Sequence, residues 1–181
     1  MLQELRLEGK LHTRTLRIAA RVVAMLLLSQ TGLETADLSA NSLDGSSYAL
    51  KSPQAAQEAF ARILDAVSVG SLSELSLSSN DLTPDACPQL RDLLNGSRLK
   101  SLDLSHNRLG ASGVRMLTLA VGRLTSLDLS YNFLCAEGGI CISQVGRTAC
   151  DVRNGRRAAS APRRTHARSA DVNTNARQAR T

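Results

Sequence analysis

The chain of 181 residues is long enough for one ordinary domain or a short repeat array, and 43% of its residues are hydrophobic but only 2% aromatic. Because it has no tryptophan and few other rings, the composition argues against a base-stacking nucleic-acid platform or an aromatic cage. The net charge of +6 is uneven, since residues 1–146 hold 13 basic and 14 acidic residues and residues 147–181 hold nine arginines and two aspartates. The sequence therefore predicts a nearly neutral, leucine-filled body and a basic tail.

Four segments follow the pattern L-x-x-L-x-L-x-x-N-x-L, beginning at Leu33, Leu72, Leu99 and Leu124, and the first departs from it only at Ala36. A degenerate copy begins at Leu2, with Lys10 at the Asn position and His12 at the last Leu position. The spacings are 31, 39, 27 and 25 residues along the series Lys10, Asn41, Asn80, Asn107 and Asn132. This recurrence predicts one array of about five units over residues 1–146.

Each copy predicts a short strand followed by a helix, because the alternation L-x-L changes to helical spacing after the Asn. In chain order we expect a helix over residues 14–28, a loop insertion over 44–52 and a helix from about Pro53 to Val69. The later helices should bury residues four positions apart: Ala86, Leu90 and Leu94, then Gly113, Leu117 and Val121, then Gly138 and Ile142. Regular structure should end near Gly146.

The four asparagines of the pattern stand where the chain leaves each strand. An amide side chain offers both donors and acceptors to backbone groups that such a turn leaves unpaired. We therefore predict a structural turn role, and no catalytic role, for Asn41, Asn80, Asn107 and Asn132.

The strand–helix pattern over residues 2–144 resembles the leucine-rich repeat family, and within it the ribonuclease-inhibitor-like subfamily. The resemblance implies an α/β fold, a short right-handed solenoid with a concave parallel sheet and convex helices. It also implies a non-catalytic interaction module that binds a partner protein on the concave face or its rim. The array departs from the family in being short, in having Lys10 at a turn and in its 39-residue spacing.

The positions between the leucines should face the concave side, because side chains alternate along a strand. An acidic stripe for a basic partner segment is then formed by Asp37, Glu74, Asp103 and Asp128. The alternative is that these side chains are only the soluble filler of a duplicated repeat.

The turn positions differ between units and define a rim that carries Asp81, His106, Arg108, Tyr131 and Phe133. Tyrosine and arginine often anchor protein interfaces, so Tyr131 with Arg108 is the predicted hot spot, and His106 is a further candidate binding residue of the rim. For Phe133 the alternative is a core plug near the end of the array.

Catalytic and metal chemistry find no support in the motifs. The sequence has no phosphate loop, zinc-protease motif or nucleophile elbow, so we expect neither an enzyme nor a cofactor. We expect the cysteines to be small buried residues, because no metal-ligand spacing relates Cys87, Cys135, Cys141 and Cys150. By analogy with the subfamily, a GTPase-activating or regulatory scaffold is the alternative function.

The tail over residues 147–181 should be disordered, because it is rich in arginine and has almost no large apolar residue. Its pairs Arg156-Arg157 and Arg163-Arg164 suit nuclear import or non-specific phosphate binding, which is a further alternative function. Other interpretations are a solvated extension without a role and a coding frame lost after Cys141.

No stretch is apolar enough over roughly 20 residues to cross a bilayer, and Glu4 and Glu8 do not suit a signal peptide. We therefore expect a cytoplasmic protein, with the nucleus as the alternative. The terminal strand, near Leu5 to Leu7, offers an open edge on which Glu4, Arg6 and Glu8 can prevent pairing with another chain. The oligomeric state stays open.

Overall fold

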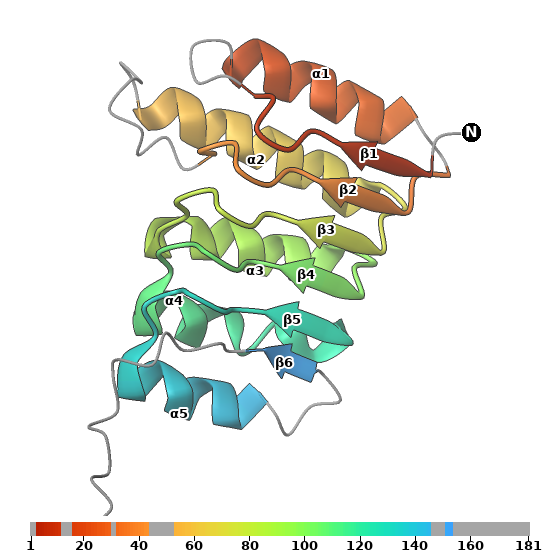
Figure 1. Cartoon of the computed structure of the whole chain (residues 1–181). Coiled ribbons are helices and arrows are strands. Elements are labelled where there is room, and N and C mark those ends of the chain that lie inside the picture. Colours follow the sequence, from red (N-terminus) through yellow and green to blue (C-terminus); the bar gives the residue numbers. More distant parts are fainter. Residues whose placement is uncertain (1–2, 12–15, 30–31, 44–52, 146–150, 154–181) are drawn as a thin grey trace, which may run out of the picture.

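The computed structural model describes residues 3–11, 16–29, 32–43, 53–145 and 151–153. These residues form a solenoid in which one parallel sheet lies in front of a layer of helices (Figure 1). The sheet has the order β1-β2-β3-β4-β5-β6, so each strand pairs with the strand of the next unit. The strands are β1 (Glu4–Arg6), β2 (Thr35–Asp37), β3 (Glu74–Ser76), β4 (Ser101–Asp103), β5 (Ser126–Asp128) and β6 (Asp151–Arg153).

The central residue of each strand points into the core. The register aligns these residues in one row, Leu5, Ala36, Leu75, Leu102, Leu127 and Val152. A second row of leucines follows two residues later, and its members Leu38, Leu77, Leu104 and Leu129 are fully buried. Burial of each leucine contributes roughly 1.5 to 3 kcal/mol. The predicted orientation of the L-x-L positions is thus confirmed.

The helices cover the other face of the sheet, and their lengths vary more than those of the strands. They are α1 (Leu16–Ser29), α2 (Pro53–Val69), α3 (Cys87–Gly96), α4 (Gly110–Leu117) and α5 (Cys135–Val145), with short 3-10 turns η2 (Pro84–Ala86) and η3 (Val121–Arg123). The predicted bounds of α2 are confirmed, and the described part of α1 begins at Leu16, since residues 14 and 15 lie outside the described residues. Every residue predicted for the buried side of the later helices is buried except Ile142, which is half-buried at the end of the array.

The asparagine side chains join successive units through a ladder of hydrogen bonds. The Oδ1 atom of Asn107 accepts from the backbone N–H groups of Asn80 and Leu82, both at 3.0 Å. Its Nδ2 group donates to backbone carbonyls of the same unit and of the preceding one, those of Leu104, Ser105 and Leu77. Asn41, Asn80 and Asn132 repeat this arrangement and are equally buried. These bonds are the ones that the predicted turn role of the asparagines requires.

The first turn departs from the prediction. His12 was expected at the last Leu position, but it lies outside the described residues. Leu11 is buried instead, and its N–H donates to Asn41 Oδ1 at 2.8 Å, as the N–H of Leu109 does to Asn132 Oδ1. Lys10 lacks an amide and is exposed, so its side chain does not continue the ladder.

The predicted end of regular structure near Gly146 is wrong, because β6 adds a sixth strand beyond it. The N–H of Asp151 donates to Thr125 O, the N–H of Leu129 donates to Arg153 O, and Val152 packs against the core. The disordered tail predicted from residue 147 therefore cannot include residues 151–153. Its arginine pairs, the predicted loop 44–52 and Cys150 lie outside the described residues.

The cysteines do not share one environment. Cys87 is fully buried, which confirms the prediction for it, and burial together with the nearby charge of Asp85 raises the pKa of its thiol to about 12. Cys141 is half-buried, and Cys135 is exposed, so the prediction of a buried residue is wrong there. Within the described ranges, no helix has the length and apolar character needed to pass through a bilayer.

Candidate binding surface

The concave face presents the outward residues of the strands in two parallel columns. Because the strands pair in register, one column consists of Glu4, Thr35, Glu74, Ser101, Ser126 and Asp151. The other consists of Arg6, Asp37, Ser76, Asp103, Asp128 and Arg153, which we call the aspartate column. Three predicted acidic residues share the aspartate column, while Glu74 stands in the neighbouring one. The predicted stripe is therefore two columns wide.

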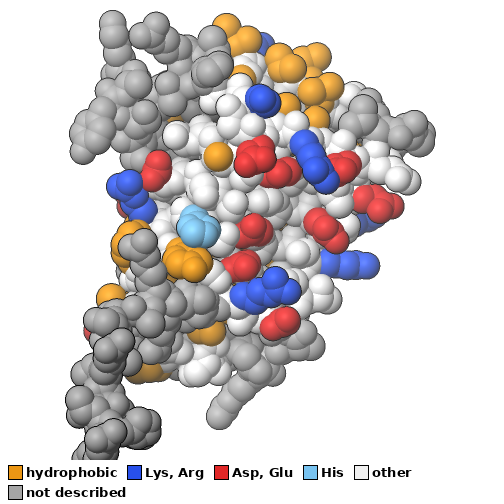
Figure 2. Space-filling view, in the orientation of Figure 1, with side chains coloured by type: hydrophobic (Ala, Val, Ile, Leu, Met, Phe, Trp, Pro, Cys, Tyr) orange, Lys and Arg blue, Asp and Glu red, His pale blue; other side chains and the backbone are white. Residues whose placement is uncertain are grey.

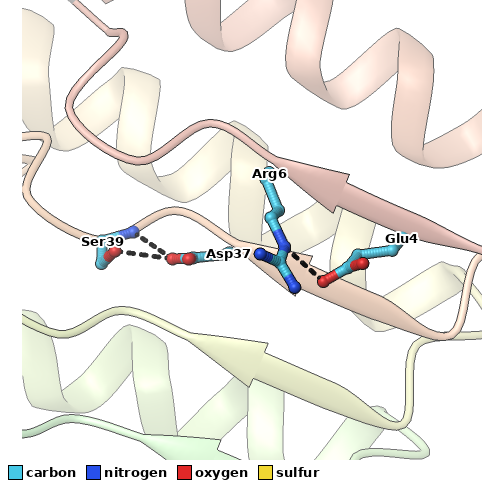
Figure 3. A network of polar contacts seen from close by, with 4 residues as sticks. All are labelled: Glu4, Arg6, Asp37 and Ser39. Carbon is cyan, nitrogen blue, oxygen red and sulfur yellow. Dashed lines mark hydrogen bonds and ion pairs between the residues drawn. The ribbon is translucent and has the colours of Figure 1, made fainter.

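Each aspartate also stabilises the end of its own strand. The Oδ1 atoms of Asp103 and Asp128 accept the N–H of the serine two residues later, both at 2.8 Å. Asp37 Oδ1 accepts both the N–H of Ser39 at 3.0 Å and its hydroxyl at 2.6 Å (Figure 3). This is a local turn that short acidic side chains favour. The three carboxylates thus have a structural role in addition to their charge.

The columns enclose a depression of about 210 Å³ between β1, β2, β3 and β4. Carboxylates of Glu4, Asp37, Glu74 and Asp103 line it together with hydroxyl groups of Thr35, Ser76 and Ser101. The hydroxyl of Ser76 donates to Asp103 Oδ2 at 3.4 Å, which links two strands. The depression is therefore polar and acidic, and it suits a cationic group better than an apolar one.

Arginines close the aspartate column at both ends. Arg6 is next to Asp37 in the register, and Arg153 is next to Asp128. Figure 2 shows acidic side chains over the middle of this face and basic side chains on either side of them. Arg6 also donates to Glu4 Oε1 of its own strand at 2.5 Å, and this bond is the first cause that raises the pKa of its guanidinium (Figure 3).

The rim beyond β4 and β5 carries an aromatic stack. The rings of His106 and Tyr131 lie 4.3 Å apart between centroids and 14° from parallel. Both residues precede a ladder asparagine and have positive φ angles, 55° and 59°. The N–H of His106 donates to Ser130 O at 2.8 Å, so the backbone fixes the position of the stack. Both side chains are exposed, as predicted.

Two more rim residues flank this stack in sequence, each directly after a ladder asparagine. Arg108 Nη2 lies 2.9 Å from Asp81 Oδ1, which joins two successive units by an ion pair. Phe133 is 75% exposed, so its alternative prediction as a core plug is wrong. Its φ angle is 56°, and the next residue, Leu134, is the one that enters the core. We define the rim cluster as Asp81, His106, Arg108, Tyr131 and Phe133.

The predicted binding residues therefore fall into two groups. The acidic residues lie on the concave face, and His106, Arg108 and Tyr131 lie on the rim at the carboxyl ends of the strands. Sequence reasoning missed Arg153, since its strand contains no leucine. The available signal was spacing, because Asp103, Asp128 and Arg153 are successive partners 25 residues apart.

Comparison with known proteins supports the same repeat. Residues 98–117 and 124–143 match the family model described as Leucine Rich repeat. A similar solved structure is the tropomodulin C-terminal domain of Caenorhabditis elegans, with a TM-score of 0.57 and 14% identity over 78% of this chain and 84% of that one. That likeness concerns the fold alone. No curated protein matches the chain in sequence. The chain thus contains leucine-rich repeats and folds as a leucine-rich repeat solenoid.

Proposed function

We propose that the chain is a non-catalytic module that binds a partner protein through the rim cluster and the adjoining aspartate column. The observation that carries this proposal is the exposed His106–Tyr131 stack beside the 75% exposed Phe133. Solenoids of this kind generally bind other proteins with such extended surfaces. Aromatic and arginine side chains supply most of the binding energy at protein interfaces.

The rim cluster is well prepared for binding because its backbone is already ordered. Asn107 and Asn132 fix the turns from below, and the stack restricts the rotation of both rings. A partner therefore immobilises few additional side-chain rotations when it covers the cluster. This favours a stable interface over a small area.

The aspartate column adds electrostatic selectivity. Its acidic middle favours a basic segment of the partner, and Arg6 and Arg153 limit that segment to the span of β2 to β5. We also assign the chain to the ribonuclease-inhibitor-like subfamily, supported by the α-helices that follow β1 to β5 on the convex side.

The experiment compares two substitutions of exposed residues in a quantitative affinity capture from cell extract. Tyr131→Ala removes half of the stack, and Arg115→Ala changes an exposed residue of α4 on the convex side. We expect Tyr131→Ala to capture at least tenfold less partner protein than the unaltered chain does, and Arg115→Ala to capture the same amount. Equal capture by both variants, with unchanged thermal unfolding, would remove the rim from the binding surface.

A further inference from the structure

Helix α1 is apolar on two sides. Its inner side buries Ala20, Val23 and Leu27 against the array. Its outer side exposes Ile18, Val22 and Met25 by 69%, 51% and 71%. These three positions are four and three residues apart, so they form one stripe along the helix. We call them the α1 stripe.

The α1 stripe lies on the side of α1 opposite the buried residues, at the amino-terminal end of the array. Inside the array, α2 packs against α1 on one side and against α3 on the other. At the amino-terminal end, none of the described residues buries the corresponding side of α1. Figure 2 shows hydrophobic side chains gathered at the top of the view, where Figure 1 places α1. Such a surface is typical of a protein contact.

The strand of the same unit has an open edge. Backbone groups of Gln3, Leu7 and Gly9 bond to the second unit. Because alternate residues of a parallel strand bond to the same neighbour, the backbone groups of Glu4 and Arg6 face the opposite direction. Among the described strands, β1 and β6 are the two at the edges of the sheet.

We propose that a second copy of this chain covers this end of the solenoid, with the two β1 strands antiparallel about a two-fold axis at Leu5. In this register Glu4 of each copy lies opposite Arg6 of the other, as a hydrogen-bonded pair. The side chains that already form an ion pair within one strand then form a ring of four alternating charges. The strand edge complements itself.

The neighbouring registers lack this complementarity. An axis at Arg6 places two arginines opposite each other and pairs Glu4 with Glu8, and an axis at Glu4 places two glutamates together. Like charges directly opposite on paired strands are destabilising. Among axes placed within β1, the charge order Glu4, Arg6, Glu8 therefore selects the one at Leu5, and it does more than discourage pairing.

The helices fit the same arrangement. Paired strands lie about 4.8 Å apart, and packed helices lie about 8 to 10 Å apart. A second copy placed at these two spacings would extend the sheet and the helix layer together. One such step from β1 brings the α1 stripe against the α1 stripe of the second copy. The apolar stripe and the charged edge are thus covered by one partner, and both rims remain accessible.

The first test measures molar mass by analytical ultracentrifugation of the whole chain at concentrations up to about 100 µM. We expect a reversible dimer that Arg6→Glu weakens at least tenfold, because Glu4 then faces a second glutamate. The double variant Glu4→Arg with Arg6→Glu exchanges the charges and should restore the dimer. Arg123→Glu, an exposed change in η3, is the charge control and should leave it unaltered.

The second test concerns the helix. Met25→Asp should reduce dimerisation at least tenfold, whereas Ile140→Asp on the exposed side of α5 should not. All these side chains are exposed, so we expect each variant to fold, and circular dichroism checks this. A monomeric unaltered chain, a dimer that resists Arg6→Glu, or a double variant that fails to recover would each overturn the proposal.

Discussion

The concave side and the helix layer of this solenoid follow different rules. On the concave side, every described strand has three residues, and the asparagine ladder keeps the units in one register. In the helix layer, the helices range from 8 residues in α4 to 17 in α2. Hydrogen bonds have directions and must be satisfied one by one, whereas apolar contacts only require that space be filled. The strands therefore keep one length and register, while the helices behind them can differ in length.

This comparison predicts the largest loss of stability for a charge placed behind the sheet. Leu104→Asp puts a carboxylate at a fully buried position whose surroundings are leucines, so we expect a loss of about 4 kcal/mol or more and an unfolded array. Circular dichroism and urea unfolding measure it. The control is Leu119→Asp, because Leu119 is 90% exposed. Native-like unfolding of Leu104→Asp would contradict the register.

The ladder should follow next. Asn107→Ala leaves the N–H groups of Asn80 and Leu82 without this acceptor and removes the amide donor from the carbonyl of Leu77. The carbonyls of Leu104 and Ser105 also lose it but keep the Asn132 amide and the Ser79 N–H as donors. We expect a loss of about 2 to 4 kcal/mol in the free energy of unfolding, measured in urea. Asn95→Ala, at an exposed position of α3, is the matched control and should change little. A loss below about 1 kcal/mol for Asn107→Ala would show that the ladder does not hold the units together.

A substitution in the helix layer should cost less. At Gly113 an added Cβ would lie 2.8 Å from Cys87 Sγ and 3.4 Å from Pro84 Cα, so the buried thiol or α4 must shift. We expect Gly113→Ala to lower the stability by about 1 to 2 kcal/mol, measured by thermal unfolding. At Gly122 nothing lies within 4 Å of the added atom, so Gly122→Ala should cause no loss. The comparison between the two sides fails if Gly113→Ala costs as much as Asn107→Ala.

The smallest effect appears only in alkali. The folded chain raises the pKa of Cys87 from 9.0 to about 12, so the unfolded thiol loses its proton first as the pH rises. The unfolded state then binds fewer protons, and the stability falls between about pH 9 and 12. Urea unfolding at pH 8 and 10 should show a larger decrease for the unaltered chain than for Cys87→Ala. Equal decreases would mean that Cys87 does not contribute.

Much of the fold could be predicted from the sequence because its strongest signal is local. The spacing of the leucines and asparagines is enough to predict the strand register, the buried rows and the structural role of the turn amides. Pro53 marked the start of α2 correctly, since proline suits a first helical turn. The placement of His106 and Tyr131 on the rim followed from their positions beside the asparagines.

The failures share a cause, which is that the ends of an array obey weaker patterns. Val152 replaces leucine in β6, so the composition of the tail concealed a strand that pairs through its backbone. Arg153 was missed for the same reason. Leu11 shows that one residue more or less in a turn changes which side chain is buried. Cys135 shows that residue type alone does not predict burial. The His106–Tyr131 stack joins matching positions of two successive units, 25 residues apart, and the prediction did not use this spacing.

The positive φ angles of the turns have a consequence for how this surface can vary. Eight described residues other than glycine have them: Ala40, Ser42, Ser79, Asp81, His106, Tyr131, Phe133 and Cys135. None of the eight is valine, isoleucine or threonine, whose branched Cβ disfavours this region. Substitutions at these rim positions are therefore restricted to residues that are not branched at Cβ. New binding specificities would arise by exchanging aromatic rings, small polar groups and charged groups.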